Sequence, residues 1–316
     1  MADSNCLVSI VLPVYNGFPY LSKAVESIVG QTEKRWKLIV VNDGSTDESK
    51  DYLDSIKDPR VVVIHQENQG LSPALNRGLA ECDTPLIGRM DGDDISYSTR
   101  LEKQVSYLQQ NPDVGLLGTQ IQRVGSVRSD SGSDLPVTHQ AIWDALMAGQ
   151  HAICHPTIVC RREVFDLVGG YKEGLGEEWD MFLRIGEQWQ LANLPECLFG
   201  YRYHSTSING SRMGELRRRI RFQCECARRR NNGESPILYE DYVKSENEGS
   251  ILRRTCRGIE DFSRASYHAA VADILGKHRL RGYARLGFAA FSAPQLTWAR
   301  IHRRLRRSSN TAGSEN

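Results

Sequence analysis

The acidic run Arg89-Met90-Asp91-Gly92-Asp93-Asp94 contains side chains suited to binding a metal ion. Three carboxylates within four residues repel one another at neutral pH unless a cation lies between them. Gly92 lets the backbone turn tightly enough to aim two of them at one point. The alternative is a solvated acidic turn, because Asp and Gly are common turn residues. Leu86-Ile87-Gly88, just before the run, is typical of a buried strand, so the acids would follow a strand's carboxyl end, where open α/β sheets bind ligands.

Two other polar segments also follow expected strands. Asp43, in Asn42-Asp43-Gly44-Ser45-Thr46-Asp47, could accept hydrogen bonds from a base or a ribose, or the segment could be an Asx turn and helix cap. Gly70 opens an expected helix, where free N–H groups and the helix dipole favour anions. Arg77 could add a positive charge near a phosphate, although a solvent-facing arginine is the alternative.

The elements that must position these segments alternate between strand and helix. Apolar runs predict strands at 6–14, 36–41, 61–64 and 86–88. Helices are expected at 21–28 and at 70–80, and a polar helix that ends at residue 53 lies between them. A helix from Ser98 to Gln110 places Arg100 close enough to orient the acidic run, although it could equally face solvent. Strands at 114–119, 158–160 and 198–203 and helices at 139–148 and from Glu177 follow. This order indicates a doubly wound, mostly parallel (mixed) α/β sheet with helices on both faces.

Composition and charge indicate two regions. Residues 1–210 contain 18 Lys and Arg against 28 Asp and Glu, whereas 211–316 contain 22 against 11. We therefore expect a first domain over 1–210 and a basic helical region over 211–316, with helices from Met213 and at 239–246, 260–277 and 283–293. The segment 124–136 is rich in Gly, Ser and Asp and is a candidate mobile loop.

Several classes of protein do not fit the sequence. The eight cysteines include no CxxC pair, so neither a zinc ribbon nor a disulfide framework is indicated. Neither a signal peptide nor a membrane-spanning segment is expected, and reduced buried thiols fit a cytoplasmic protein.

Four segments in order and spacing resemble the donor half of the family 2 inverting glycosyltransferases with the GT-A fold. They are PVYNG (13–17), NDGSTD (42–47), NQGLSPALNRG (68–78) and RMDGDD (89–94). The resemblance covers roughly residues 6–210. It implies a nucleotide-sugar donor, usually a UDP-sugar, and Mn²⁺ or Mg²⁺. A hard divalent ion that bridges the leaving diphosphate needs only one or two protein carboxylates, which agrees with the short acidic run.

The resemblance also implies roles for individual residues. Asp93 would be the direct metal ligand, Asp91 would contact the ribose or the water shell of the metal, and Asp94 would face the donor sugar or brace the loop. The nucleotide and sugar would be bordered by Pro13, Tyr15, Asn16, Asp43 (towards the base), Gly70, Asn76 and Arg77.

The start of the helix at Glu177 is the candidate source of a general base. An inverting transfer needs one base to take the proton of the attacking hydroxyl. Glu178 shares a helix face with Met181 and Phe182, so apolar walls would raise its pKa, whereas Asp180 precedes Arg184 by the spacing of a helical ion pair. Glu178 also occupies the place of the family's second acid, usually Asp. We therefore favour Glu178 as the base over Asp180 and Glu177. The alternative is that these acids only complement the helix dipole.

Two histidines are further candidates. His155, in His155-Pro156-Thr157, resembles an acceptor-side segment of the family, and His204, in Tyr201-Arg202-Tyr203-His204, resembles a closing segment whose histidine lies near the diphosphate or metal. His204 is therefore a candidate third metal ligand. For both, a hydrogen-bonded structural histidine is the alternative.

The basic C-terminal region has no recognised nucleic-acid motif and no interleaved stacking aromatics, so we expect no nucleic-acid partner. An anionic membrane surface at the inner leaflet fits better, because a lipid-linked acceptor would bring the enzyme there. Plain solvation of the charges is the alternative.

Together these features predict a metal-dependent inverting glycosyltransferase, transferring a hexosyl or N-acetylhexosaminyl group from a nucleotide-sugar to a hydroxyl of a glycan or lipid-linked saccharide. The alternatives are a sugar-1-phosphate nucleotidylyltransferase, which lacks support because no glycine-rich, lysine-containing phosphate loop lies near the N-terminus, and a non-catalytic nucleotide-sugar-binding scaffold.

Overall fold

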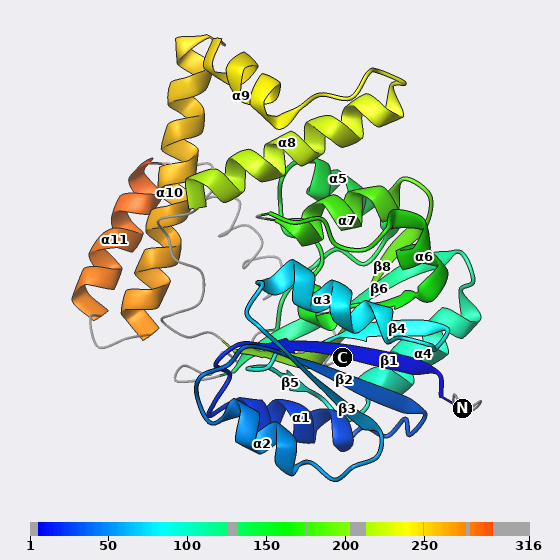
Figure 1. The fold of residues 1–316 in the computed structure, drawn as a ribbon. Helices are drawn as coiled ribbons and strands as arrows, with labels where there is room; N and C mark the ends of the chain where they lie inside the picture. Colours follow the sequence, from blue (N-terminus) through cyan, green and yellow to red (C-terminus); the bar gives the residue numbers. More distant parts are fainter. Residues whose placement is uncertain are drawn as a thin grey trace, which may run out of the picture. The chain divides into compact units, whose positions relative to one another are not determined.

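Alternating strands and helices build the first half of the chain in the computed structural model, which describes residues 6–124, 132–174, 176–202, 213–248, 250–275 and 279–292. The elements up to the acidic run are β1 (Val8–Val14), α1 (Leu21–Val29), β2 (Trp36–Asp43), α2 (Ser49–Ser55), β3 (Val61–Gln66), α3 (Leu71–Ala80) and β4 (Leu86–Arg89) (Figure 1). Strands β1, β2, β3 and β4 are mutually parallel in the order β3-β2-β1-β4. The expected βαβα pattern is confirmed.

The remaining strands extend this sheet and make it mixed. The next elements are β5 (Ile95–Ser96), α4 (Arg100–Gln110), β6 (Val114–Val124), α5 (His139–Met147), the 3₁₀ turn η1 (His155–Thr157), β7 (Val159–Arg161), α6 (Arg162–Val168), α7 (Glu177–Gly186) and β8 (Gln190–Arg202). Strand β7 pairs antiparallel with β4 and β6, and β6 pairs parallel with β8, giving the order β3-β2-β1-β4-β7-β6-β8-β5.

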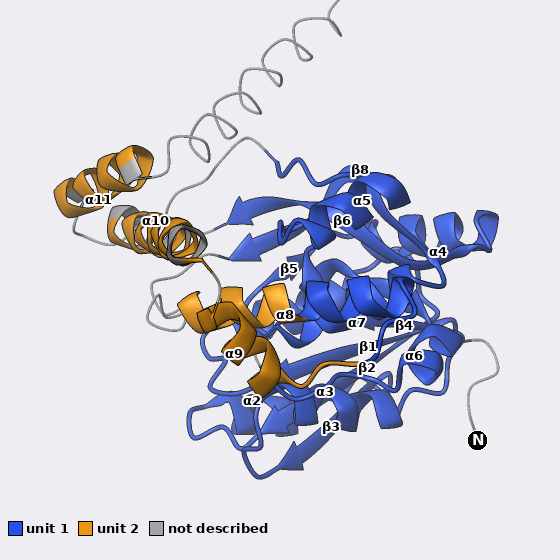
Figure 2. Cartoon of the chain, turned by 90° about the horizontal axis from the view of Figure 1, so that it is seen from above, with its two compact units in different colours: residues 1–203, 223–235 blue, residues 204–222, 236–316 orange. Residues whose placement is uncertain are grey.

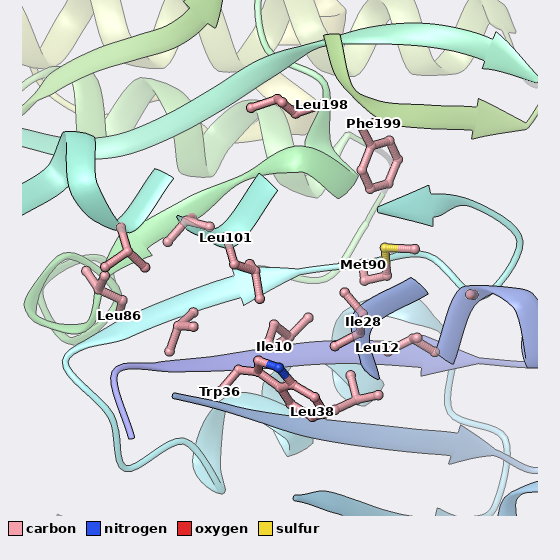
Figure 3. Close-up of a cluster of buried hydrophobic side chains, with 14 of the residues drawn as sticks. Ile10, Leu12, Ile28, Trp36, Leu38, Leu86, Met90, Leu101, Leu198 and Phe199 are labelled. Carbon is pink, nitrogen blue, oxygen red and sulfur yellow. The ribbon is translucent and has the colours of Figure 1, made fainter. Parts of the chain in front are cut away.

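The main hydrophobic core lies on one face of this sheet. Every residue of β1 is buried, and Ile10 and Leu12 point towards Ile28 of α1 and Leu101 of α4 (Figure 3). Strands covered on both faces need nearly continuous apolar sequence, which is why β1 and β2 could be recognised as unbroken runs.

Helix α3 covers the opposite face and approaches it closely. A Cβ built on Gly78 would lie 2.5 Å from Val11 Cγ1 and 3.3 Å from Val41 Cγ2. Any larger residue at position 78 would therefore push α3 away from β1 and β2, together with the segment that leads into it.

The chain divides into two compact units (Figure 2). Unit 1 comprises residues 1–203 and 223–235, and unit 2 comprises residues 204–222 and 236–316. The C-terminal helices are α8 (Met213–Asn231), α9 (Tyr239–Glu248), α10 (Ile251–Leu275) and α11 (Arg279–Ser292). The boundary expected at residue 210 lies outside the described residues. Within the described ranges, no helix combines the length and apolarity that crossing a bilayer requires.

Several element boundaries differ from the expected ones, including the end of β6 at Val124 and the start of α11 at Arg279, and the starts of β8 and α10 differ most. Strand β8 begins at Gln190 rather than near Leu198, so the strand continues through Pro195. This proline lies in a region where the pairing with β6 shifts register between Thr119 and Ile121. Such irregularities accommodate a proline that would otherwise mark the end of a strand. Helix α10 begins at Ile251 rather than at Glu260, since its first turns contain polar and basic residues with weak periodicity.

Candidate active site

The carboxyl ends of β1, β2 and β4 bring the predicted donor segments to one edge of the sheet. Val14 is the register partner of Asn42, and Val11 is the partner of Arg89. The loops after β1 and β2 are also tied directly, since the Thr46 N–H donates to Asn16 Oδ1 at 2.7 Å. Pro13 is buried within β1, whereas the Tyr15 side chain is exposed at this edge.

Asp43 is buried at the end of β2 and fastens the segment that precedes α3. Its carboxylate accepts hydrogen bonds from Gln66 Nε2 at 2.7 Å and from the backbone N–H groups of Gln69 and Gly70, both at 2.9 Å. A carboxylate offers about four acceptor positions, so roughly one remains for a ligand. The Gly70 N–H, which the sequence suggested as an anion donor, is used by Asp43 instead.

Asn76 and Arg77 of α3 are also engaged with protein groups. The Asn76 amide donates to the Tyr171 carbonyl at 2.8 Å and accepts from the Tyr171 N–H at 2.9 Å, which joins α3 to the loop after α6. Arg77 pairs with Glu81 one turn later on an exposed surface. Contacts of Asn76 and Arg77 with a donor stay predictions.

Asp91, Asp93 and Asp94 form a loop cluster in which one oxygen of each carboxylate lies within 4.8 Å of the others. Burial raises the pKa of Asp91, against the nearby Arg89 charge, and raises the pKa of Asp94 well above its usual range, with Asp91 and Asp93 adding to the effect. A cation among these oxygens would relieve the mutual repulsion.

Arg89 pairs with Asp91 from the end of β4. Its Nη1 lies 3.0 Å from Asp91 Oδ2 and its Nη2 lies 2.5 Å from Asp91 Oδ1, a two-pronged pair that fixes the plane of this carboxylate. Arg89 Nε is buried and has no hydrogen-bond partner among the described residues. Arg100, fully buried on α4, donates from Nη2 to the Arg89 carbonyl at 2.9 Å, so it does orient the start of the acidic run.

Arg202 holds the other end of the loop cluster from β8. Its backbone N–H donates to Asp94 Oδ1 at 2.7 Å, its Nε donates to the Asp93 carbonyl at 2.6 Å, and its guanidinium lies 4.4 Å from the centre of the Tyr20 ring. The second oxygen, Asp94 Oδ2, is buried without a hydrogen-bond partner in the described part of the chain. An unsatisfied buried carboxylate oxygen beside two other carboxylates suits a hard metal ion or a hydroxyl donor.

His155, Glu177 and Glu178 form a second group, the helix cluster, at the start of α7. One ligand atom from each lies within 4.8 Å of the others. Burial raises the pKa of Glu177 to about 7, with Glu178 adding to the effect, and burial likewise raises the pKa of Glu178. The raised Glu178 pKa agrees with its expected apolar surroundings. A carboxylate in this state is a suitable proton acceptor near neutral pH.

His155 Nε2 and the Tyr171 hydroxyl share a hydrogen bond of 2.9 Å. Burial and the Arg89 charge hold the His155 pKa well below its usual range, so the imidazole is neutral. Asp180 forms the expected ion pair with Arg184 at 2.8 Å and lies 3.5 Å from Lys172. Asp180 is therefore tied into the fold, unlike the two glutamates that precede it.

The Arg89 charge acts on both clusters. It pairs directly with Asp91 and also lowers the pKa values of Glu177 and Glu178, against their burial. No role for Arg89 was predicted from the sequence, although an arginine two residues before an aspartate at the end of a buried strand is a usable signal. Arg202 was missed as a brace because its partners are 108 and 109 residues away along the chain. His204 and residues 125–131 of the expected mobile loop lie outside the described residues.

Comparisons with known proteins agree with this geometry. The sequence profile of the family described as "Glycosyl transferase family 2" matches residues 9–169. The O-antigen biosynthesis glycosyltransferase WbnJ of Escherichia coli is 30% identical over 216 residues, covering 65% of this chain and 83% of that protein. The putative glycosyltransferase EpsE of Bacillus subtilis is 30% identical over 215 residues, covering 65% of this chain and 76% of that protein.

Solved structures resemble the chain at lower sequence identity. S. aureus TarS 1–349 in complex with UDP-GlcNAc has a TM-score of 0.56 at 12% identity and covers 92% of each chain. The mannosyltransferase PcManGT from Pyrobaculum calidifontis, in complex with GDP-Man and Mn²⁺, has a TM-score of 0.54 at 17% identity and covers 93% of this chain and 79% of that one. At these identities the likeness establishes the fold.

Proposed function

The chain belongs to glycosyl transferase family 2 and is a glycosyltransferase with the GT-A fold, and we propose that it transfers the sugar of a nucleotide-sugar with inversion of configuration at the anomeric carbon. The donor is a nucleotide-sugar, and we assign it as a UDP-sugar. The acceptor is a hydroxyl of a glycan or lipid-linked saccharide. Support for this acceptor class comes from relatives named for O-antigen and amylovoran biosynthesis.

The observation that carries this proposal is the pair of acidic clusters that share the Arg89 charge. The loop cluster has three converging carboxylates at the carboxyl edge of the sheet, and the helix cluster has two glutamates with raised pKa values. Glycosyl transfer to a hydroxyl needs these two functions, one on the leaving diphosphate and one on the attacking oxygen.

Asp91 and Asp93 would hold a Mn²⁺ or Mg²⁺ ion, with His204 as a candidate third ligand. The fit rests on three carboxylates whose oxygens lie within 4.8 Å and on the unpartnered Asp94 Oδ2. When bound, the ion neutralises the charge that develops on the leaving nucleoside diphosphate. Arg89 and Arg202 fix the carboxylate and the backbone that present these ligands.

Glu178 would act as the general base. It takes the proton from the acceptor hydroxyl while that oxygen forms a bond to the anomeric carbon, and the bond from this carbon to the phosphate oxygen breaks on the opposite face. The configuration therefore inverts, through an oxocarbenium-like transition state. Glu177 and Asp180 remain lower-ranked candidates, and Asp180 ranks lowest because it is already paired with Arg184.

The remaining assignments concern the donor side and the acceptor side of the site. Nucleotide and sugar contacts are assigned to Pro13, Tyr15, Asn16, Asp43, Gly70, Asn76, Arg77, Asp91 and Asp94. His155 lies on the acceptor side, where its neutral imidazole and the Tyr171 hydroxyl would border the attacking group. We further assign the place of action to the inner face of a membrane, reached through the basic C-terminal region.

Donor turnover tests the proposal directly. Calorimetry across a panel of nucleotide-sugars should identify one or a few that bind. The matching donor should then release nucleoside diphosphate in the presence of Mn²⁺ and not in the presence of EDTA. NMR of the product should show the opposite anomeric configuration to the donor. Release of pyrophosphate would identify a nucleotidylyltransferase, retention of configuration would exclude the inverting mechanism, and activity in EDTA would exclude metal dependence.

A further inference from the structure

Helices α10 and α11 of unit 2 form a hairpin whose internal contacts use few large side chains from α11. The two helices lie side by side (Figures 1 and 2), with the Ser263 hydroxyl donating to the buried Ala289 carbonyl at 2.9 Å. Arg281 and Arg285 both pair with the Asp273 carboxylate, at 2.6 and 2.8 Å. The packing of α11 therefore depends on small residues, on ion pairs and on one aromatic contact, in which the ring centre of Phe288 lies 5.8 Å from that of Phe262 on α10.

Four large apolar side chains of α11 are nevertheless more than half exposed to solvent. The residues concerned, with their exposed fractions, are Leu280 (89%), Tyr283 (60%), Phe288 (53%) and Phe291 (86%). At 100° per residue they fall within an arc of roughly 140°, so they form one continuous stripe, which we name the α11 face. Monomeric soluble proteins rarely expose large contiguous apolar patches, of more than roughly a few hundred Å², and such patches usually mark an interaction surface.

The surroundings of the α11 face are positively charged. Residues 279–292 contain three arginines and no acidic residue, and residues 251–292 contain eight Lys and Arg against three Asp and Glu. Arg281 and Arg285 share a single carboxylate, so that group of three keeps a net positive charge. An exposed apolar face with aromatic residues, flanked by arginines, is the pattern of a helix that lies in the interface of an anionic bilayer.

We infer that the α11 face docks on an anionic lipid bilayer, with Leu280 and Phe291 entering the headgroup and acyl boundary. The partner is a membrane rather than a second copy of the chain, because two such faces would bring like-charged arginine clusters together. This inference deepens the proposed function, on which it rests for the lipid-linked acceptor, by naming the element that contacts the membrane.

Vesicle sedimentation of the full chain tests this inference. Wild type should sediment with vesicles of 70% phosphatidylcholine and 30% phosphatidylglycerol and much less with pure phosphatidylcholine. The double variant Leu280→Ser/Phe291→Ser should bind the anionic vesicles roughly 100-fold more weakly, since two large side chains no longer leave water. Leu238→Ser, which removes another exposed leucine of unit 2, is the matched control and should bind as wild type does.

A second measurement reports insertion directly. Phe291→Trp should add fluorescence that brominated lipids quench in anionic vesicles, whereas a Leu238→Trp control should add fluorescence that they do not quench. Equal binding of wild type and Leu280→Ser/Phe291→Ser, or equal binding to both kinds of vesicle, would overturn the inference. So would a wild-type dimer that binds no vesicles and becomes monomeric in the double variant, because the α11 face would then be an interface between copies.

The inference and the proposed function fail separately. Donor turnover in solution, without vesicles, should be the same in wild type and in Leu280→Ser/Phe291→Ser. A chain that binds anionic vesicles through the α11 face but turns over no nucleotide-sugar keeps the docking inference and loses the proposed function. A chain with full turnover and no vesicle binding loses the docking inference alone.

Discussion

The loop cluster and the helix cluster hold similar acidic groups in different ways. Arg89 clamps Asp91 with two nitrogens, and Arg202 holds the Asp93 backbone and the Asp94 carboxylate. In the helix cluster neither glutamate forms a direct ion pair with any described residue. The first arrangement fixes oxygen positions, as a metal site requires, and the second leaves proton affinity high, as a base requires. Substitutions in one cluster should therefore affect metal binding, and substitutions in the other should affect proton transfer.

Asp93→Ala should reduce donor turnover by roughly 10³-fold or more, because removing the direct metal ligand removes several kcal/mol of charge stabilisation on the leaving diphosphate. Calorimetric titration with Mn²⁺ should show binding by wild type and none by the variant. Asp51→Ala, an exposed acid at the start of α2, is the control and should change neither quantity. Unchanged Mn²⁺ affinity in Asp93→Ala would show that the loop cluster is not the metal site.

Glu178→Gln should lower kcat by about 10²- to 10⁴-fold, the usual contribution of a general base. Affinity for Mn²⁺ and for the nucleotide should stay within twofold of wild type, since the loop cluster is untouched. Single-turnover transfer with saturating donor and acceptor is the measurement. Glu177→Gln should reduce kcat much less. If instead Glu177→Gln is the more damaged variant, the roles of the two glutamates are exchanged.

The pH dependence of kcat/KM should also come from the helix cluster. Burial raises the pKa of Glu177 to about 7 and also raises the pKa of Glu178. The reactive form of the base is the carboxylate, so activity should fall by about tenfold per pH unit below the pKa of the cluster and level off above it. Glu177→Gln removes a neighbouring negative charge, so the pKa of Glu178 should fall and the acidic limb should move to lower pH. An acidic limb that does not move would mean that Glu177 and Glu178 titrate independently.

Much of the fold, and the place of the acidic run at the carboxyl end of β4, could be predicted from sequence, because the signals are local. Strands β1 and β2 are buried on both faces and read as unbroken apolar runs, and the acidic run follows directly from β4. The helical spacing after Glu177 also predicted that Asp180 would pair with Arg184. These features depend on residues within about ten positions of one another.

The partners of the site residues could not be predicted in the same way. Arg202 meets Asp94 across 108 positions, and Asn76 meets Tyr171 across 95, so neither contact leaves a periodic signal. Asp43 was predicted to face a base, whereas most of its acceptor positions are filled by the segment before α3. Residue type alone does not reveal whether a carboxylate accepts hydrogen bonds from the protein or from a ligand. Side-chain contacts between distant segments decide that.

The smallest effect is expected at Arg202, which positions the loop cluster without being a ligand. Arg202→Met keeps the backbone N–H bond to Asp94 but loses the Nε donor to the Asp93 carbonyl and the charge over Tyr20. The loss of one such hydrogen bond corresponds to about 1.4 kcal/mol, so Mn²⁺ should bind about tenfold more weakly. The measurement is Mn²⁺ titration followed by electron paramagnetic resonance of the free ion, with nucleotide present and absent.

Arg161→Met is the matched control for this prediction. Arg161 also braces backbone from a strand, since its guanidinium donates to the carbonyls of Leu108, Asn111 and Val114. Arg161→Met should lower the free energy of unfolding, because three hydrogen bonds are lost, and should keep wild-type Mn²⁺ affinity. The acidic limb of the pH profile should not move in Arg202→Met, because the helix cluster sets it. If that limb moves while Mn²⁺ affinity is unchanged, Arg202 acts on protonation rather than on geometry, and the two clusters do not divide metal binding and proton transfer between them.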